Sequence, residues 1–252
     1  MADNPPSGES SLRVLGSAPR AESPASTVPT EAHPEAHPDA LATASERGAS
    51  ALVTALVRSF QDQVRRALKA ELDGSITSLA YVDYYVSLAR DEDREPIVSL
   101  LAAGAGAYFG ELVRREMGGT WVGDGEDPRR LRLLLEPQFV HFSPVDQAYE
   151  AIAGTGLEPN DPRLAPGPAF DSGFGLRPED PDDPTEDEAS WLSDRLAELP
   201  PVPEDQFHSL TCRFETLQLM LELLAARQVA EGLPPRRLSL ADYVEVLSRS
   251  AD

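Results

Sequence analysis

The stretch Pro96–Val122, PIVSLLAAGAGAYFGELVRREMGGTWV, decides the fold because it permits two structures that exclude each other. In the first, Gly104, Gly106 and Gly110 form a dinucleotide-binding turn after a short strand, and Asp124 follows at the distance where an acid meets a ribose hydroxyl. In the second, the same glycines lie inside one long helix that ends just before a strand. The choice separates a cofactor-binding fold from a helical core.

The flanking sequence favours the helix. Pro96 follows a run of charged residues and would occupy the first helical turn, where its missing N–H costs nothing. A doubly wound sheet would also need several more strand–helix alternations, and the residues after Val122 do not supply them. We therefore predict a helix from Pro96 to Glu116 that ends at the pair Gly118-Gly119, and we expect no cofactor.

Small residues give this predicted helix a narrow face. Ala102, Gly106 and Gly110 recur every fourth residue, so they lie on one side of the helix. Each interior glycine lowers helix propensity by about 1 kcal/mol relative to alanine. We infer that another element packs closely against this face and compensates for that cost.

The remaining periodicities predict an α+β fold that is mainly helical, with a small three-stranded antiparallel sheet. The expected strands cover residues 120–122, 131–135 and 139–142. The expected further helices cover residues 50–72, 75 or 78 to 88, 144–153, 185–199, 203–231 and 239–249. Ser143 is the predicted N-cap of the helix at 144–153, and Ser239, in a capping box with Asp242, begins the last helix.

Composition divides the chain into four parts. Residues 1–48 are rich in proline, alanine and serine, carry few apolar residues to bury, and are predicted to be disordered. Residues 49–153 form the predicted core, residues 154–184 an acidic loop rich in proline and glycine, and residues 185–252 helices that pack on the core or form a second subdomain. The chain shows no secretory signal and no run of about 18 apolar residues, so we expect a cytoplasmic protein without a membrane span.

The chain carries a net charge of −21, and its acids are concentrated in one region. Residues 157–205 hold 14 acidic residues against three arginines. This field repels phosphates, so we expect neither a nucleic acid nor a membrane as partner; it favours a basic protein, although solubility alone would also explain it. The predicted partner-binding acidic patch consists of Glu179, Asp180, Asp182, Asp183, Glu186, Asp187 and Glu188. Because these acids lack the glycine and the final glutamate of a calcium-binding loop, we expect no metal site.

Four residues are candidates for a ligand-binding or catalytic pocket: Tyr108, Glu111, Trp121 and His141. Glu111 follows the small-residue face and is placed to meet Trp121, but we favour a structural role for it, as the partner of an N–H group or of a neighbouring arginine. His141 alternates with two apolar residues and would face the side of the sheet away from the core. A pocket requires all four side chains to converge, so the enzyme question stays open, with a non-catalytic protein favoured.

The helix predicted over residues 203–231 carries an apolar seam with the three–four spacing of packed helices. The seam consists of Phe207, Leu210, Phe214, Leu217, Leu221 and Leu224. We expect it to pack into the protein's own core, with a homo-oligomer as the alternative. The single cysteine, Cys212, excludes an intrachain disulfide, and with only His208 one turn before it we expect a small buried residue rather than a catalytic thiol.

A family resemblance covers residues 78–153. The segment GAYFGELVRREMGGTWV, followed by a charged turn and the strand LRLLLEP, resembles the core of several uncharacterised bacterial domain families. Those families share a helix of the form Gly-x-Tyr/Phe-x-Gly-Glu, then Gly-Gly-x-Trp and two or three short strands. They have no established enzymatic activity, and some members lie near toxin and immunity genes. The resemblance therefore implies an immunity or partner-binding role.

These observations lead to one expected function and two alternatives. We expect a non-catalytic acidic protein-interaction domain, such as an adaptor, a regulator or an immunity-type partner. The first alternative is a small-molecule binding domain or enzyme with a pocket around Glu111. The second is a structural or assembly subunit that uses the C-terminal helix seam.

Overall fold

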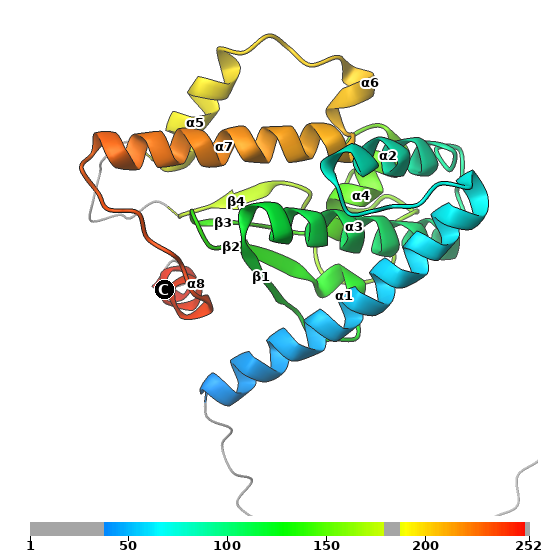
Figure 1. Cartoon of the computed structure of the whole chain (residues 1–252), viewed down its shortest axis with the longest axis horizontal. Helices are drawn as coiled ribbons and strands as arrows, with labels where there is room; N and C mark the ends of the chain where they lie inside the picture. The colour runs from blue at the N-terminus through cyan, green and yellow to red at the C-terminus, as the bar shows by residue number, and fades with distance from the viewer. Residues whose placement is uncertain (1–37, 179–186, 250–252) are drawn as a thin grey trace, which may run out of the picture. The chain divides into compact units, whose positions relative to one another are not determined.

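The computed structural model describes residues 38–178 and 187–249 of the 252-residue chain (Figure 1). The helices are α1 Pro38–Leu68, α2 Leu79–Ser87, α3 Glu95–Met117, α4 Pro144–Ala153, α5 Glu188–Ala197, α6 Glu204–Phe207, α7 Leu210–Ala230 and α8 Leu240–Arg249. The strands are β1 Gly119–Val122, β2 Arg132–Leu135, β3 Val140–Phe142 and β4 Phe174–Leu176. Short 3-10 turns cover Ile76–Ser78 and Pro128–Arg130. The predicted α+β class, mainly helical with a small antiparallel sheet, is confirmed.

The sheet has four strands in the order β1-β2-β3-β4, all antiparallel, rather than the predicted three. The additional strand, β4, comes from the segment 154–184 that was predicted to be a loop. Its sequence, FGL, is too short to show the alternation of apolar and polar residues that indicates a strand. Pairing with β3 holds this segment as a strand instead. The Phe174 ring also packs edge-on against Phe142 at 5.1 Å between centroids.

The pairing register separates the two faces of the sheet. Trp121, Leu133, Phe142 and Phe174 are successive cross-strand partners and share the face toward α3, where the Trp121 ring lies against Gly110. Thr120, Leu134, His141 and Gly175 are partners one position along and share the opposite face. Side chains alternate strictly along a strand, so these two sets cannot meet.

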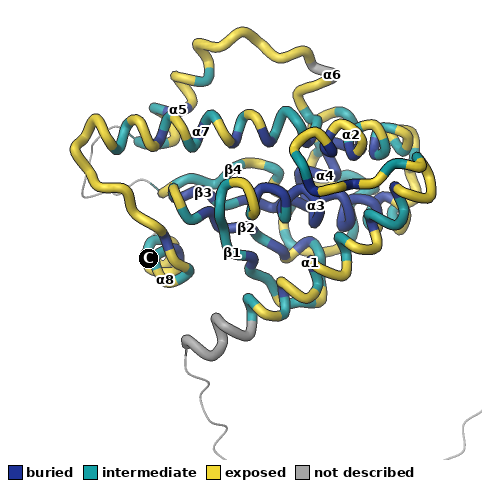
Figure 2. Tube along the Cα trace, viewed as in Figure 1, coloured by how far each residue is buried: buried dark blue, intermediate teal, exposed yellow. Residues whose placement is uncertain are grey.

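Helix α3 packs on α4 through its glycines. A Cβ added to Gly106 would lie 2.6 Å from the carbonyl oxygen of Pro144 and from Cα of Val145, and one added to Gly110 would lie 2.3 Å from the Trp121 ring. All ten residues of α4 are buried (Figure 2). The predicted helix over Pro96–Glu116 and its closely packed small-residue face are therefore confirmed.

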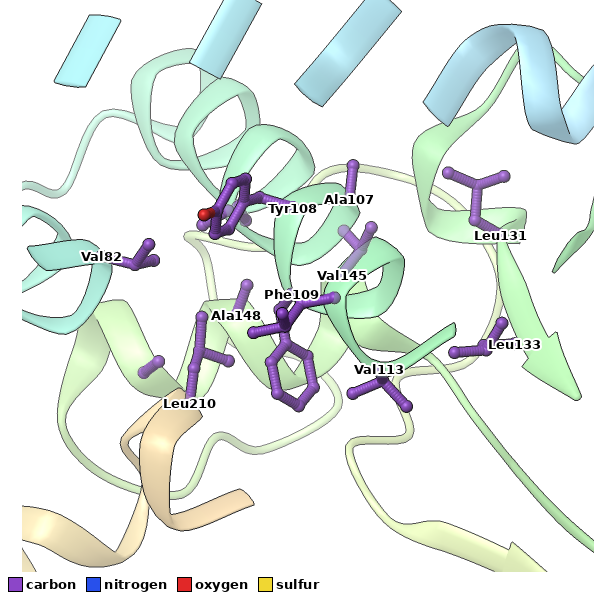
Figure 3. Packing of buried hydrophobic residues seen from close by; sticks show 14 of the residues in the cluster. Val82, Ala107, Tyr108, Phe109, Val113, Leu131, Leu133, Val145, Ala148 and Leu210 are labelled. Atoms are coloured by element: carbon purple, nitrogen blue, oxygen red, sulfur yellow. The ribbon is translucent and has the colours of Figure 1, made fainter. Parts of the chain in front are cut away.

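One buried cluster contains side chains from most of the elements. Figure 3 shows residues of α2, α3, α4, β2 and α7 in the same group, among them Val82, Phe109, Val145, Leu133 and Leu210. Among the described helices, α3 alone is long and apolar enough to cross a membrane by length and composition. Because 72% of its apolar window is buried inside the protein, α3 is the central helix of this core.

Helix α1 begins earlier than predicted. Residues 38–48 were assigned to the disordered tail, but they form the first turns of α1, so that assignment is wrong for these residues, and residues 1–37 lie outside the described part. Tertiary contacts hold this end of the helix. The Ser45 hydroxyl donates to the carbonyl of Gly123 at 2.8 Å, and Ala49 is completely buried.

Helix α7 joins the same core as α3 and α4. Leu210, Phe214, Leu217 and Leu224 are buried in the main cluster, and Leu221 packs against it. The predicted single helix over residues 203–231 is interrupted instead. Residues His208 and Ser209 separate α6 from α7. The Ser209 hydroxyl caps α7 by accepting the N–H of Cys212 at 3.1 Å. Phe207 lies before this break and is 51% exposed. An oligomer through the other seam residues would therefore require α7 to leave its own core.

A carboxylate from α2 completes the N-terminus of α7. Asp83 accepts the N–H groups of Leu210 at 2.8 Å and of Thr211 at 3.1 Å, together with the Thr211 hydroxyl. These N–H groups have no partner inside their own helix. Burial raises the pKa of Asp83, while the same hydrogen bonds act in the opposite direction. The contact joins segments 127 residues apart.

The last helix, α8, is held by one tyrosine. Ser239 and Asp242 exchange hydrogen bonds at its start, which confirms the predicted capping box. The Tyr243 hydroxyl lies 2.8 Å from the carbonyls of Leu135 and Val140 and 3.0 Å from the N–H of Val140. Its ring stacks on Phe139 at 4.2 Å. With Leu238 and Leu134 these rings form a second, smaller cluster on the sheet face opposite α3.

Gly106→Ala should destabilise the protein by about 1–3 kcal/mol, because the added methyl group meets the backbone of α4 and cannot be accommodated by a side-chain rotation. Helix propensity alone predicts the opposite sign, a gain of about 1 kcal/mol. Urea unfolding monitored by circular dichroism decides between them. A stabilised Gly106→Ala variant would show that α3 and α4 are not in close contact.

Asp83→Ala should lower the free energy of unfolding by about 1–2 kcal/mol, since two N–H groups of α7 lose their acceptor. Asp91→Ala is the matched control, because Asp91 is an exposed acid shortly after the same helix and should change stability by less than about 0.5 kcal/mol. Equal effects for the two variants in urea unfolding would contradict the capping role.

Candidate functional site

Two of the four predicted pocket residues meet. The Trp121 indole N–H donates to the Glu111 carboxylate at 3.2 Å, and the Arg114 guanidinium donates to both Glu111 oxygens at 2.9 Å. These groups line a surface groove of about 500 Å³ between α1 and β1, together with Thr120 and Glu136. The groove is polar, and its acids could receive a cationic group.

The arginine partner explains the charge state of Glu111. Burial of the carboxyl acts to raise its pKa, but the hydrogen bonds and charge of Arg114 outweigh this, so the pKa lies below its ordinary value. The carboxylate is thus ionised and satisfied by groups of its own fold. The hydrogen bond from Trp121 to this carboxylate joins α3 to β1.

Tyr108 has a structural environment on another side of α3. Its hydroxyl accepts the N–H of Gly74 at 3.0 Å and lies 2.6 Å from the Ser78 hydroxyl. The ring packs near Phe60, with 6.1 Å between centroids. Burial raises the pKa of the phenol, which keeps it protonated. Tyr108 therefore anchors the turn before α2.

His141 lies on the sheet face opposite Glu111 and Trp121. Its ring is packed against Gly175, where a Cβ would come within 2.3 Å, and it lies edge-on to Phe139 and Tyr243. Burial is the main cause that lowers its pKa. The four predicted residues therefore do not form one pocket, because the sheet separates His141 from the other three.

The predicted acidic patch falls largely outside the described residues. Glu179, Asp180, Asp182, Asp183 and Glu186 belong to that undescribed segment. Asp187 accepts the N–H groups of Ala189 and Ser190 and is thus the N-cap of α5, as expected for an acid at a helix start. Glu188 is half-buried, and its burial raises the pKa of the carboxyl.

Buried polar side chains of α4 hold the segment that follows it. Asp146 is fully buried, pairs with Arg129 at 3.3 Å, and accepts the N–H of Asp171 at 3.1 Å. Glu150, one turn on, pairs with Arg213 of α7 and accepts the N–H of Leu157 at 3.2 Å. A buried charge of this kind is tolerated because it is paired and hydrogen-bonded. The network is structural: it joins α4 to the loop before β4 and to α7.

An exposed aromatic face on α2 was not singled out from the sequence. Leu79, Val82 and Val86 are buried, whereas Tyr81, Tyr84 and Leu88 are exposed by 51%, 58% and 61% on the opposite side of the helix. The signal was present, since apolar residues of the segment LAYVDYYVSL cover most of the helix circumference, with Asp83 and Ser87 as its polar positions. A helix of that composition is expected to be covered on most sides.

Acidic side chains follow this face. Asp91 and Asp93 are exposed in the turn between α2 and α3, next to the half-buried Glu92 and its exposed partner Arg94. The Arg94 guanidinium lowers the pKa of Glu92 to about 2. We define the α2 face as Tyr81, Tyr84 and Leu88 with the exposed acids Asp91 and Asp93.

Comparison of the chain with protein-family models, with curated proteins and with solved structures gives no match. The resemblance to uncharacterised bacterial domain families therefore stays a prediction.

Glu111→Gln should make the stability of the protein less dependent on pH. The folded-state pKa of Glu111 is depressed, so its carboxylate stabilises the fold above the unfolded-state pKa and loses that effect as pH falls through the folded pKa. The difference in free energy of unfolding between wild type and variant should thus shrink from neutral pH toward about pH 3. Urea unfolding at a series of pH values measures it.

Glu116→Gln, an exposed position on the same helix, is the control for the loss of one negative charge. A difference between wild type and Glu111→Gln that stays constant over the whole pH range would show that the Arg114 and Trp121 contacts do not depend on the carboxylate charge.

Proposed function

We propose that this chain is a non-catalytic acidic interaction domain that binds a more basic protein, as an adaptor, regulator or immunity-type partner in the cytoplasm. The observation that carries the proposal is the α2 face. Two tyrosines and a leucine, each more than half exposed, lie at helix positions i, i+3 and i+7. Tyrosine is enriched among the residues that dominate the binding energy at protein interfaces. Helices with apolar side chains at this spacing bind in hydrophobic grooves of partner proteins.

The charge of the chain supports a basic partner. The whole sequence carries −21, and the α2 face includes two exposed acids next to its apolar residues. Complementary charge speeds association and rejects acidic competitors, while apolar contact supplies most of the affinity. The acidic patch at residues 179–188 would add to the same attraction.

A second candidate function rests on the groove beside Glu111. Its volume of about 500 Å³ lies in the usual range for small-molecule sites, and three glutamates, Glu46, Glu111 and Glu136, line it. A small cation would be the complementary ligand. We favour the protein partner because Glu111 is already held by Arg114 and Trp121.

Replacing the α2 face tests the proposal. The variant Tyr81→Ser, Tyr84→Ser, Leu88→Ser should lose a stoichiometric basic partner that co-purifies with the tagged wild-type chain from its native cells. Each substitution is at an exposed site, so the fold should persist, with changes within about 0.5 kcal/mol per site. Binding that remains should also weaken with added salt.

The matched control is Val229→Ser, Leu233→Ser, Val244→Ser, which removes three other exposed apolar side chains from the C-terminal part of the chain. This variant should keep the partner. The proposal fails if the wild-type chain retains no partner, or if the α2 variant and the control retain it equally.

A further inference from the structure

An apolar groove lies between α5 and α7, away from the α2 face and from Glu111. Its apolar lining is contributed by Phe174, Leu176, Leu192, Leu196, Phe207 and Met220, and its volume is about 280 Å³. Strand β4 contributes two of these residues, and α7 contributes Met220. The groove is less polar than the one beside Glu111, and apolar concavities with few polar groups are typical ligand sites.

Further exposed apolar side chains lie in the segment that follows α5. The segment that joins α5 to α6 carries Leu199 and Val202, which are 48% and 45% exposed, and it ends near Phe207, which is 51% exposed. Figure 1 shows this segment as an arch above α7. Within α5, which the structure describes in full, Leu192 alone is buried. Few buried contacts therefore hold α5 in place, and this wall of the groove can adjust to an apolar ligand.

One cation, Arg213 of α7, lies among these apolar residues. One terminal nitrogen donates to Glu150 and the other to the carbonyl of Ser172 at 3.3 Å. The third guanidinium nitrogen, Nε, is buried, and its N–H has no acceptor among the residues that the structure describes. A buried donor without an acceptor is costly, so an incoming oxygen atom that accepts from it would be stabilised.

We propose that the groove between α5 and α7 binds an aliphatic monocarboxylate, with its tail against the apolar lining and its carboxylate on Arg213. A carboxylate fits the guanidinium because the donor and the acceptor are both charged, which strengthens the hydrogen bond. The tail supplies the larger part of the affinity through burial of its methylene groups. An ammonium head group would meet the Arg213 charge, and an alcohol would lack the charge-assisted bond.

Methionine methyl resonances report on this site directly. The 252-residue chain has three methionines, Met1, Met117 and Met220, and of these Met220 lines the groove. In protein labelled with ¹³C at the methionine methyl groups, octanoate should shift the Met220 signal in a saturable way and leave Met117 in place. Octanol should bind at least about tenfold more weakly, and octylamine and acetate should give no saturable shift.

The variant Ala189→Phe fills the groove from α5, and Ala197→Phe places the same side chain on the same helix outside it. Ala189→Phe should abolish the octanoate response, and Ala197→Phe should keep it. The proposal is overturned if Met220 does not respond to octanoate, if octanol binds as tightly, or if Ala189→Phe responds like wild type.

Discussion

The close approach of α3 to α4 is the constraint on which the rest of this structure depends. It exists because Gly106 has no side chain at the point where the backbone of Pro144–Val145 passes. Gly110, one turn later, leaves room for the Trp121 ring and so places β1 against the same helix. Glycine at both positions lowers the helix propensity of α3, and the dense packing that it permits compensates for this loss of stability.

Helix α4 then organises the outer parts of the molecule. Because it is buried on every side, its two carboxylates must be satisfied inside the protein, and segments distant in sequence satisfy them. Asp146 holds the loop before β4, and Glu150 holds α7 through Arg213. Carboxylates of α4 therefore help to hold the edge strand β4 and helix α7 in place. The α2 face and the groove beside α5 stay uncovered.

Local signals in the sequence predicted much of the fold. Pro96 and Gly118 gave the bounds of α3 to within one residue, and Ser143 and Ser239 are caps as expected. The elements that local signals did not predict are determined by tertiary contacts. β4 is a strand because it pairs with β3, and the first turns of α1 are ordered by the turn after β1.

The candidate site was harder to predict, for a geometric reason. Spacing placed Glu111 near Trp121, which their hydrogen bond bears out. Whether His141 joins them depends on the register of three strands, and a shift of one residue reverses the answer. The exposure of Tyr81 and Tyr84 depends on which helices cover α2, and a segment with apolar residues over most of its circumference does not reveal this.

Native-state hydrogen exchange of the α4 amides tests the central role of this helix most directly. If α4 is the part around which the other elements pack, its amides exchange only when the whole protein unfolds. Their exchange free energy should then equal the free energy of unfolding from urea denaturation, and α8 should open at lower free energy. Exchange of α4 through a partial opening, while the amides of α1 or α7 stay protected, would contradict this account.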